Sequence, residues 1–151
     1  MKDHSAMAVD YFKAGYSCAQ AVACAFAEEM NMDTDTVARL ASSFGGGMGR
    51  LREVCGTVSG ALLVLGAVKG YDDPRDPQLK IAHYTRVQDF AARFREKHGA
   101  IVCRELMAGL AAAKSTSPEA EPRTPEFYKV RPCARFVESA ASILEEMLAE
   151  G

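Results

Sequence analysis

Cysteine is the residue type through which this chain is best equipped to do chemistry. Its 151 residues include five cysteines, three histidines and no tryptophan, and the cysteines are Cys18, Cys24, Cys55, Cys103 and Cys133. Thiolates are nucleophiles and metal ligands, so such a set suits thiol/disulfide exchange, a metal site made of four cysteines or an iron–sulfur cluster. Because the number is odd, the five thiols cannot all pair with one another inside one chain.

The local spacing of the cysteines excludes several familiar sites. No C-x-x-C occurs, so the spacing indicates neither a thioredoxin-type redox pair nor a zinc ribbon. The haem-attachment motif C-x-x-C-H is also absent. Any shared site must therefore be assembled by the fold from distant parts of the chain.

Four cysteines fall at predicted helix starts. Each follows or occupies a helix-initiating position, and the four are Cys18, Cys55, Cys103 and Cys133. The start of a helix carries about half a positive charge, which stabilises a thiolate and lowers its pKa. Arginines flank the last three of these cysteines in the sequence. We therefore expect four activated thiols. They are the candidate catalytic residues, and in the alternative hypothesis the same four are the candidate metal ligands.

The cysteines are not equivalent in this interpretation. Cys55 combines a glycine-flanked helix start with Arg50 and Arg52, so it is the candidate nucleophile, and Cys18 is the candidate resolving thiol. Cys24 lies six residues after Cys18, in the middle of the same predicted helix and on another face. It is expected to be a small core residue.

The elements that must position these thiols are helices. Apolar residues recur at helical spacing, and helix-favouring residues outnumber Val and Ile. The pattern predicts one all-α domain over residues 1–151, a bundle of six to seven helices. They span about residues 5–13, 18–30, 34–42, 55–69, 77–97, 101–110 and 133–149. Residues 55–69 are apolar nearly all round and should form the buried central helix.

Three local features complete the predicted arrangement. Ser17 has the residue type of a helix cap, and Asp76 followed by Pro77 is typical of a helix start. The helix over residues 77–97 should bury one face, formed by Ile81, Tyr84, Val87, Ala91 and Phe94. Residues 114–126 hold three prolines and scattered charges, and are expected to be a mobile loop.

Glycines gather just before and inside the predicted central helix. Residues 44–50 read as a loop, but they lack the Gly-Lys-Ser/Thr of a P-loop and the third glycine of a dinucleotide fingerprint. We expect a tight loop passing the thiols, with backbone N–H groups available to sulfur. Gly46, Gly47 and Gly56 are the candidate cofactor-binding positions. The four-residue spacings Gly56/Gly60 and Gly66/Gly70 predict close approach of neighbouring helices.

Composition narrows the classes of partner. Eighteen Lys and Arg face twenty Asp and Glu, giving a net charge of −2, so binding to nucleic acid or to an acidic membrane surface is not expected. The N-terminal residues show no secretion signal, and no apolar run approaches the ~20 residues needed to cross a bilayer. The sequence predicts no membrane insertion and a cytoplasmic location, where thiols stay reduced.

The four-cysteine pattern resembles the C_GCAxxG_C_C family, proteins proposed to be redox-active. The resemblance lies in residues 15–20 (GYSCAQ), 44–49 (FGGGMG), 55–60 (CGTVSG) and 103–106 (CREL), and in Cys133. Thr57 stands where the family pattern has Ala, and Cys24 matches no family cysteine. The resemblance implies redox or metal chemistry at the four other cysteines and names no substrate.

Three hypotheses remain open from the sequence. The first is a thiol-based redox protein that passes electrons to a partner protein and needs no cofactor. The second is a protein whose four thiolates hold zinc or an iron–sulfur cluster. The third is a non-redox helical interaction module with cysteines as core filler. A homo-oligomer is compatible with each.

Overall fold

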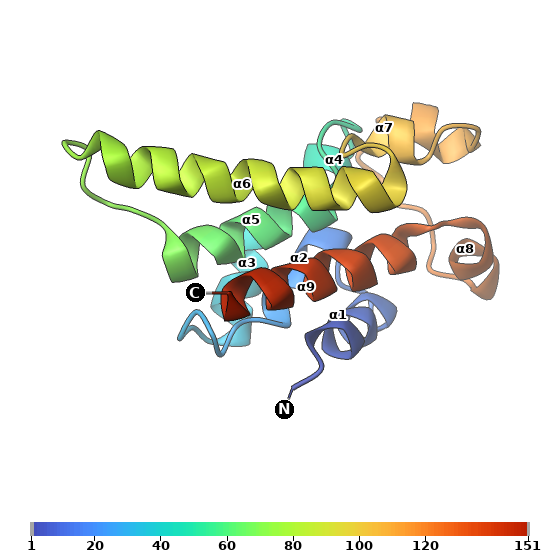
Figure 1. Ribbon diagram of the computed structural model, residues 1–151. Coiled ribbons are helices and arrows are strands. Elements are labelled where there is room, and N and C mark those ends of the chain that lie inside the picture. The colour runs from blue at the N-terminus through green and yellow to red at the C-terminus, as the bar shows by residue number, and fades with distance from the viewer. Residues whose placement is uncertain (1, 151) are drawn as a thin grey trace.

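The computed structural model describes residues 2–150, and within this range the chain is all-helical, as predicted (Figure 1). The helices are α1 (His4–Lys13), α2 (Cys18–Cys24), α3 (Thr34–Ala41), α4 (Gly45–Met48), α5 (Gly56–Lys69), α6 (Pro77–His98), α7 (Cys103–Leu106), the 3₁₀ helix η1 (Ala111–Lys114), α8 (Pro125–Val130) and α9 (Cys133–Ala149). No strand forms among these residues, although Val54 and Val102 make an isolated antiparallel bridge. None of the described helices is both long and apolar enough to span a bilayer.

Local capping chemistry explains where several helices begin. The Ser17 side chain accepts a hydrogen bond from the Gln20 N–H, and the Gln20 side chain accepts one from the Ser17 N–H, which is a complete capping box. Asp76 accepts from two first-turn N–H groups of α6, and Pro77 follows it as the first helical residue. Both starts were predicted from the sequence and are confirmed.

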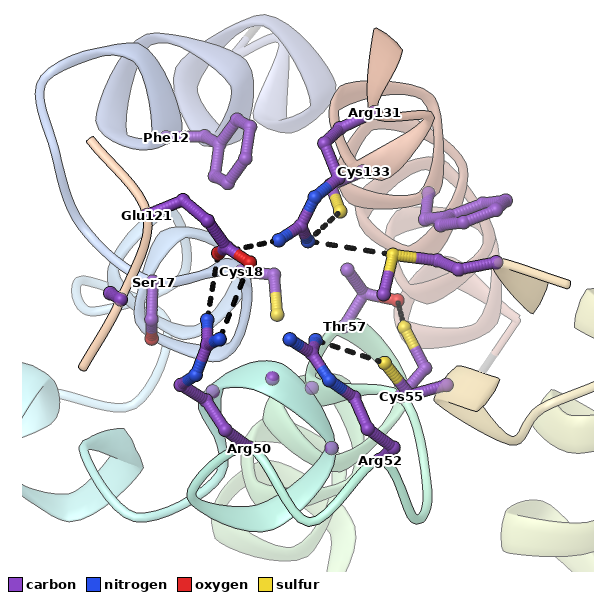
Figure 2. A pocket seen from close by; sticks show the side chains of 18 of the residues that line it. Phe12, Ser17, Cys18, Arg50, Arg52, Cys55, Thr57, Glu121, Arg131 and Cys133 are labelled. Atoms are coloured by element: carbon purple, nitrogen blue, oxygen red, sulfur yellow. Dashed lines mark hydrogen bonds and ion pairs between the residues drawn. The ribbon is translucent and has the colours of Figure 1, made fainter. Parts of the chain in front are cut away.

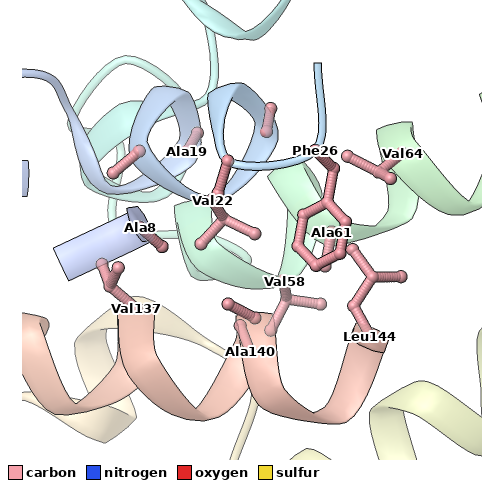
Figure 3. Packing of buried hydrophobic residues seen from close by; sticks show 14 of the residues in the cluster. Ala8, Ala19, Val22, Phe26, Val58, Ala61, Val64, Val137, Ala140 and Leu144 are labelled. Atoms are coloured by element: carbon pink, nitrogen blue, oxygen red, sulfur yellow. The ribbon is translucent and has the colours of Figure 1, made fainter. Parts of the chain in front are cut away.

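The core lies where α5 packs against α2, α6 and α9, while α1 covers α2 and α9. Its side chains are mostly small, and Figure 3 shows a cluster that includes Ala8, Ala19, Val22, Phe26, Val58, Ala61, Val64, Val137, Ala140 and Leu144. The predicted central helix is confirmed, because α5 buries residues along most of its length. A Cβ added at Gly60 would stand 2.5 Å from the Ala19 carbonyl oxygen, so glycine permits the close crossing of α2 and α5.

The structure corrects several predicted element boundaries. The helix expected over residues 18–30 ends at Cys24, because the chain tightens into turns with Phe26 and Ala27 donating to carbonyls only three residues back. The helix expected over residues 101–110 is only the single turn of α7. Residues 45–48 and 125–130 form short helices that the sequence pattern did not indicate.

Two packing predictions are also partly wrong. On α6 the buried residues are Phe90, Ala91 and Phe94, whereas Ile81 and Tyr84 are more than half exposed. The buried positions therefore lie in the C-terminal half of α6, and the periodicity alone did not reveal that its first half lacks a cover. Gly66 has no neighbour within 4 Å of an added Cβ, so the Gly66/Gly70 spacing is not a helix crossing.

Candidate functional site

All four cysteines at helix starts line one cavity of about 370 Å³ (Figure 2). Cys18 opens α2, Cys103 opens α7 and Cys133 opens α9, while Cys55 caps the start of α5. All five cysteines are free thiols. Cys24 does not line the cavity and is buried in the core, which is the placement its mid-helix position predicted.

Backbone pairing holds Cys55 and Cys103 on the same side of the cavity. The Cys55 N–H donates to the Ile101 carbonyl at 2.7 Å, and the Cys103 N–H donates to the Glu53 carbonyl at 2.6 Å. The antiparallel Val54–Val102 bridge lies between these two bonds. Two thiols distant in sequence are thus positioned by a short piece of sheet-like pairing.

The glycine-rich turn forms the adjoining wall. Gly46, Gly47 and Gly49 have φ between 60° and 75°, in the left-handed region that glycine adopts most readily. A Cβ on Gly47 would come within 2.8 Å of the Cys103 Cβ and 2.7 Å of the Glu53 nitrogen. Because Gly46 and Gly47 have no side chains, the backbone can approach the thiols at this wall of the cavity.

Gly56 plays the same part between α2 and α5. A Cβ there would stand 2.5 Å from the Cys18 sulfur and 2.8 Å from the Phe44 carbonyl oxygen. The missing side chain lets the start of α5 lie directly against Cys18. All three glycines proposed from the sequence thus border the cavity, and their role in binding a cofactor stays a prediction.

Burial dominates the protonation of three cavity thiols. It raises the pKa of Cys18, of Cys55 and of Cys133, the last to about 11. Neighbouring thiolates add to the effect, since Cys103 raises the pKa of Cys18, and Cys18 raises the pKa of both Cys55 and Cys133. The prediction that helix starts and arginines lower these pKa values is wrong for these three cysteines, because loss of hydration outweighs both.

Favourable partners nevertheless surround the same sulfurs. Backbone N–H groups of Gly46 and Ala19 act to lower the pKa of Cys18, and the Arg131 guanidinium, 3.9 Å from the Cys133 sulfur, acts to lower that of Cys133. The Cys55 sulfur lies 3.1 Å from the Thr57 hydroxyl oxygen, so the residue that departs from the family pattern contacts a site thiol.

Arginines line the cavity beside the thiols, and one carboxylate binds two of these arginines. Glu121 receives two bonds from Arg50, at 2.8 and 3.3 Å, and one from Arg131 at 2.7 Å. The bonds from Arg50, with the charges of Arg131 and Arg50, lower the pKa of Glu121 to about 2. Glu121 is therefore ionised at neutral pH and links two walls of the cavity.

Residues 115–124, here called the strap, run across the cavity and are tied down by arginines. Arg50 donates to the Ser117 carbonyl at 2.6 Å and Arg52 donates to the Ser115 carbonyl at 3.0 Å. From the strap, Arg123 donates to two backbone carbonyls at the end of α1 and beyond it, and its guanidinium carbon lies 4.3 Å from the centre of the Phe12 ring. The mobility expected for residues 114–126 stays a prediction, but the segment has specific contacts.

Sequence reasoning missed Glu121 and Arg123 as site residues. Both lie in a proline-containing stretch whose composition indicates only a loop. The chain has twenty acidic residues, and no local pattern in the sequence singles out Glu121.

The arrangement of ligands bears on the metal alternative. Among the described residues, no group of three or more His, Cys, Asp or Glu side chains is arranged to hold a single metal ion. The four sulfurs instead surround an open volume that also touches arginines and peptide groups. The geometry is that of a pocket with thiols in its walls.

Comparison with known proteins agrees with this arrangement of cysteines. No curated protein and no solved structure matches the chain. A family model described as "Putative redox-active protein (C_GCAxxG_C_C)" matches residues 16–147, which include all four cavity cysteines and the strap. The chain therefore belongs to the C_GCAxxG_C_C family.

Proposed function

We propose that the protein is a thiol-based redox protein in which two cavity cysteines cycle between dithiol and disulfide. The observation that carries the proposal is the meeting of four free thiols, each from the start of a different helix, in the walls of one cavity. Cys55 belongs to the hydrophobic core cluster, as Cys24 does, but it also lines the cavity with Cys18, Cys103 and Cys133, and cysteines serving only as core filler would have no reason to meet there.

The surroundings of the thiols suggest their roles. Cys18 and Cys133 are partly exposed, whereas Cys55 and Cys103 are buried. Cys55 also contacts Thr57 and has a pKa raised by burial, so we move the attacking role from Cys55 to Cys133, where Arg131 offsets part of the burial effect. Cys18 keeps the resolving role, because it is the other partly exposed thiol of the cavity and lies near enough to Cys133 to raise its pKa.

The proposed reaction consumes a disulfide on a partner molecule. The Cys133 thiol loses its proton and attacks one sulfur of that disulfide, and the other sulfur leaves as a thiolate and takes up a proton. Cys18 then loses its proton and attacks the Cys133 sulfur, which releases the second partner thiol. Two electrons and two protons pass to the partner's disulfide, and a Cys18–Cys133 disulfide remains.

Disulfide mapping tests this reaction. The reduced, metal-free protein is mixed with oxidised glutathione, quenched in acid and alkylated, and its peptides are identified by mass spectrometry. We expect one internal disulfide, between Cys18 and Cys133, with Cys24 recovered as a free thiol. Cys24→Ser should form the same disulfide and Cys18→Ser should stop at the mixed disulfide. An internal disulfide of any other pairing, or no internal disulfide, would contradict the proposal.

An iron–sulfur cluster is the second candidate function, and the shape of the site favours it over zinc. Four thiols border a cavity rather than a single point, as a cluster with several irons requires. Arginines and the Gly46 N–H could offset the negative charge of the cluster and its four thiolates.

Anaerobic reconstitution with iron and sulfide separates this candidate from the first. Here Cys24→Ser should retain iron and visible charge-transfer absorption, while Cys18→Ser should lose both. Wild-type protein that stays colourless and iron-free after reconstitution would exclude the cluster.

A further inference from the structure

Arg52 is a buried charge without an acidic partner. Its side chain is among the largest that are fully enclosed, with 2% of the residue exposed. Nε donates to the Ser115 carbonyl at 3.0 Å and Nη1 lies 3.8 Å from the Cys103 sulfur. Nη2 has no hydrogen-bond partner within residues 2–150, and Arg52 makes no ion pair there. A guanidinium stays charged, and burying it unpaired is costly.

No carboxylate of the cavity lining is free to supply the missing negative charge. The cavity lining contains four arginines and one carboxylate, that of Glu121. Arg50 and Arg131 already bind Glu121. Burial raises the pKa of Cys18, of Cys55 and of Cys133, so these thiols are neutral at pH 7. The first turns of α5 and α9 add positive potential to the same space.

The backbone holds Arg52 in place at a cost. Its φ is 63°, in the left-handed region that residues other than glycine rarely occupy. The Arg52 N–H donates to the Gly46 carbonyl at 3.2 Å, and its carbonyl accepts from the Arg104 N–H at 3.3 Å. Such a conformation persists only when its surroundings fix it, and it is common at ligand sites. Figure 2 shows the guanidinium directed into the cavity.

We propose that the cavity binds the oxyanion group of a small molecule, with the guanidinium of Arg52 as its principal donor. A volume of about 370 Å³ lies within the range of ligand pockets, so the group can belong to an inorganic oxyanion or to a small organic acid. The bound anion supplies the counter-charge that Arg52 lacks. Anion binding itself does not depend on the thiol chemistry. That the bound anion is the charged end of the redox substrate rests on the proposed function.

Ligands of equal shape and different charge test the anion site. Reduced, metal-free wild-type protein is titrated by calorimetry, at constant ionic strength, with sulfate, methanesulfonate and the uncharged dimethyl sulfone. Either anion should bind, and both should slow alkylation of Cys18 and Cys133 by the neutral reagent iodoacetamide without affecting Cys24. If only sulfate binds, the site takes inorganic oxyanions, and if methanesulfonate binds as well, it also takes organic ones. Binding of the sulfone equal to that of methanesulfonate, or no anion binding, would overturn the proposal.

Substitutions then locate the site. Arg52→Met should weaken anion binding by about tenfold or more, the effect of losing a charged hydrogen bond. Arg75→Met removes an arginine whose side chain is 89% exposed, and should leave the affinity unchanged. Equal affinities in the two variants would refute the role of Arg52. If Arg52→Met does not fold, the ligand series in the wild-type protein still decides.

The same preparations separate this inference from the proposed function. Anion binding together with a failure to form the internal disulfide would reject the thiol chemistry and keep the anion site. Disulfide formation without anion binding would reject the anion site and keep the thiol chemistry.

Discussion

The packed core and the cavity are two regions built from the same helices. Along α2, α5 and α9 the core is filled by small apolar side chains that leave little room between the helices. At the starts of those helices the packing opens, and thiols, arginines and bare backbone take over. Cys24 and Cys18 sit on one helix and belong to different regions.

Burial alone does not separate the two kinds of cysteine. Cys24 is 2% exposed and Cys55 is 6% exposed, and burial raises the pKa of both. Their neighbours differ, since the Cys24 sulfur faces the Thr34 carbonyl at 3.8 Å and core side chains, whereas Cys55 borders a space shared with other thiols. A thiol's neighbours, more than its exposure, thus distinguish a site cysteine from a core cysteine.

The largest predicted effect comes from breaking the crossing that supports both regions. Gly60→Ala places a Cβ 2.5 Å from the Ala19 carbonyl oxygen, where backbone rather than a flexible side chain must move. We expect the free energy of unfolding to fall by about 1–3 kcal/mol, as for other overpacked cores. Urea denaturation followed by circular dichroism measures the change.

Gly66→Ala is the matched control for that substitution. Gly66 is also a glycine of α5, but an added Cβ there meets nothing within 4 Å. Alanine should raise the free energy of unfolding by roughly 0.5–1 kcal/mol, because it is the better helix former. Loss of stability at Gly66 similar to that at Gly60 would mean that the α2–α5 crossing is not the cause.

The same crossing shows which features a sequence can reveal. The Ser17 and Asp76 caps are local, because a side chain bonds to an N–H two or three residues away, and both were predictable. The Gly56/Gly60 spacing predicted a close neighbour for the central helix. It did not say that the neighbour is the Cys18–Ala19 end of α2, since that depends on how the helices cross.

The thiol pKa values and the ion pairs of the site were harder to predict than the cysteines that form it. Helix starts and arginines beside cysteines indicated lowered thiol pKa values, but desolvation depends on the whole fold and reversed the direction. The arginines also turned out to be shared, since Arg50 binds Glu121 of the strap instead of a thiol. Both results depend on contacts between residues far apart in the sequence.

Two serine substitutions on α2 should have opposite effects, one mainly on stability and the other on disulfide formation. Cys24→Ser puts a hydroxyl into the core and should lower the free energy of unfolding by about 1–2 kcal/mol, while leaving disulfide formation intact. Cys18→Ser should cost less stability and abolish the internal disulfide. Urea denaturation and mass-spectrometric mapping of both variants check this. Loss of the disulfide in Cys24→Ser would contradict the assignment of Cys24 to the core alone.

The smallest predicted effect concerns the strap, which lines the cavity. The pKa of Glu121 is lowered from 4.5 to about 2, so its ion pairs add stability above pH 4.5 and lose it as the pH falls toward 2. Because the Glu121 side chain is 35% exposed, solvent screens these pairs and their contribution should stay below about 1 kcal/mol. Glu121→Gln should flatten the acid limb of a stability–pH curve by that small amount.

The same variant should change access to the cavity more clearly than it changes stability. Without the carboxylate, Arg50 and Arg131 lose the link that joins them through the strap. Alkylation of Cys18 and Cys133 at pH 8 should then become faster, while Cys24, which lies in the core, reacts as before. Equal acceleration at all three thiols would indicate general loosening of the fold. Acceleration confined to the cavity thiols would identify the Glu121 ion pairs as the contact that keeps the strap over the site.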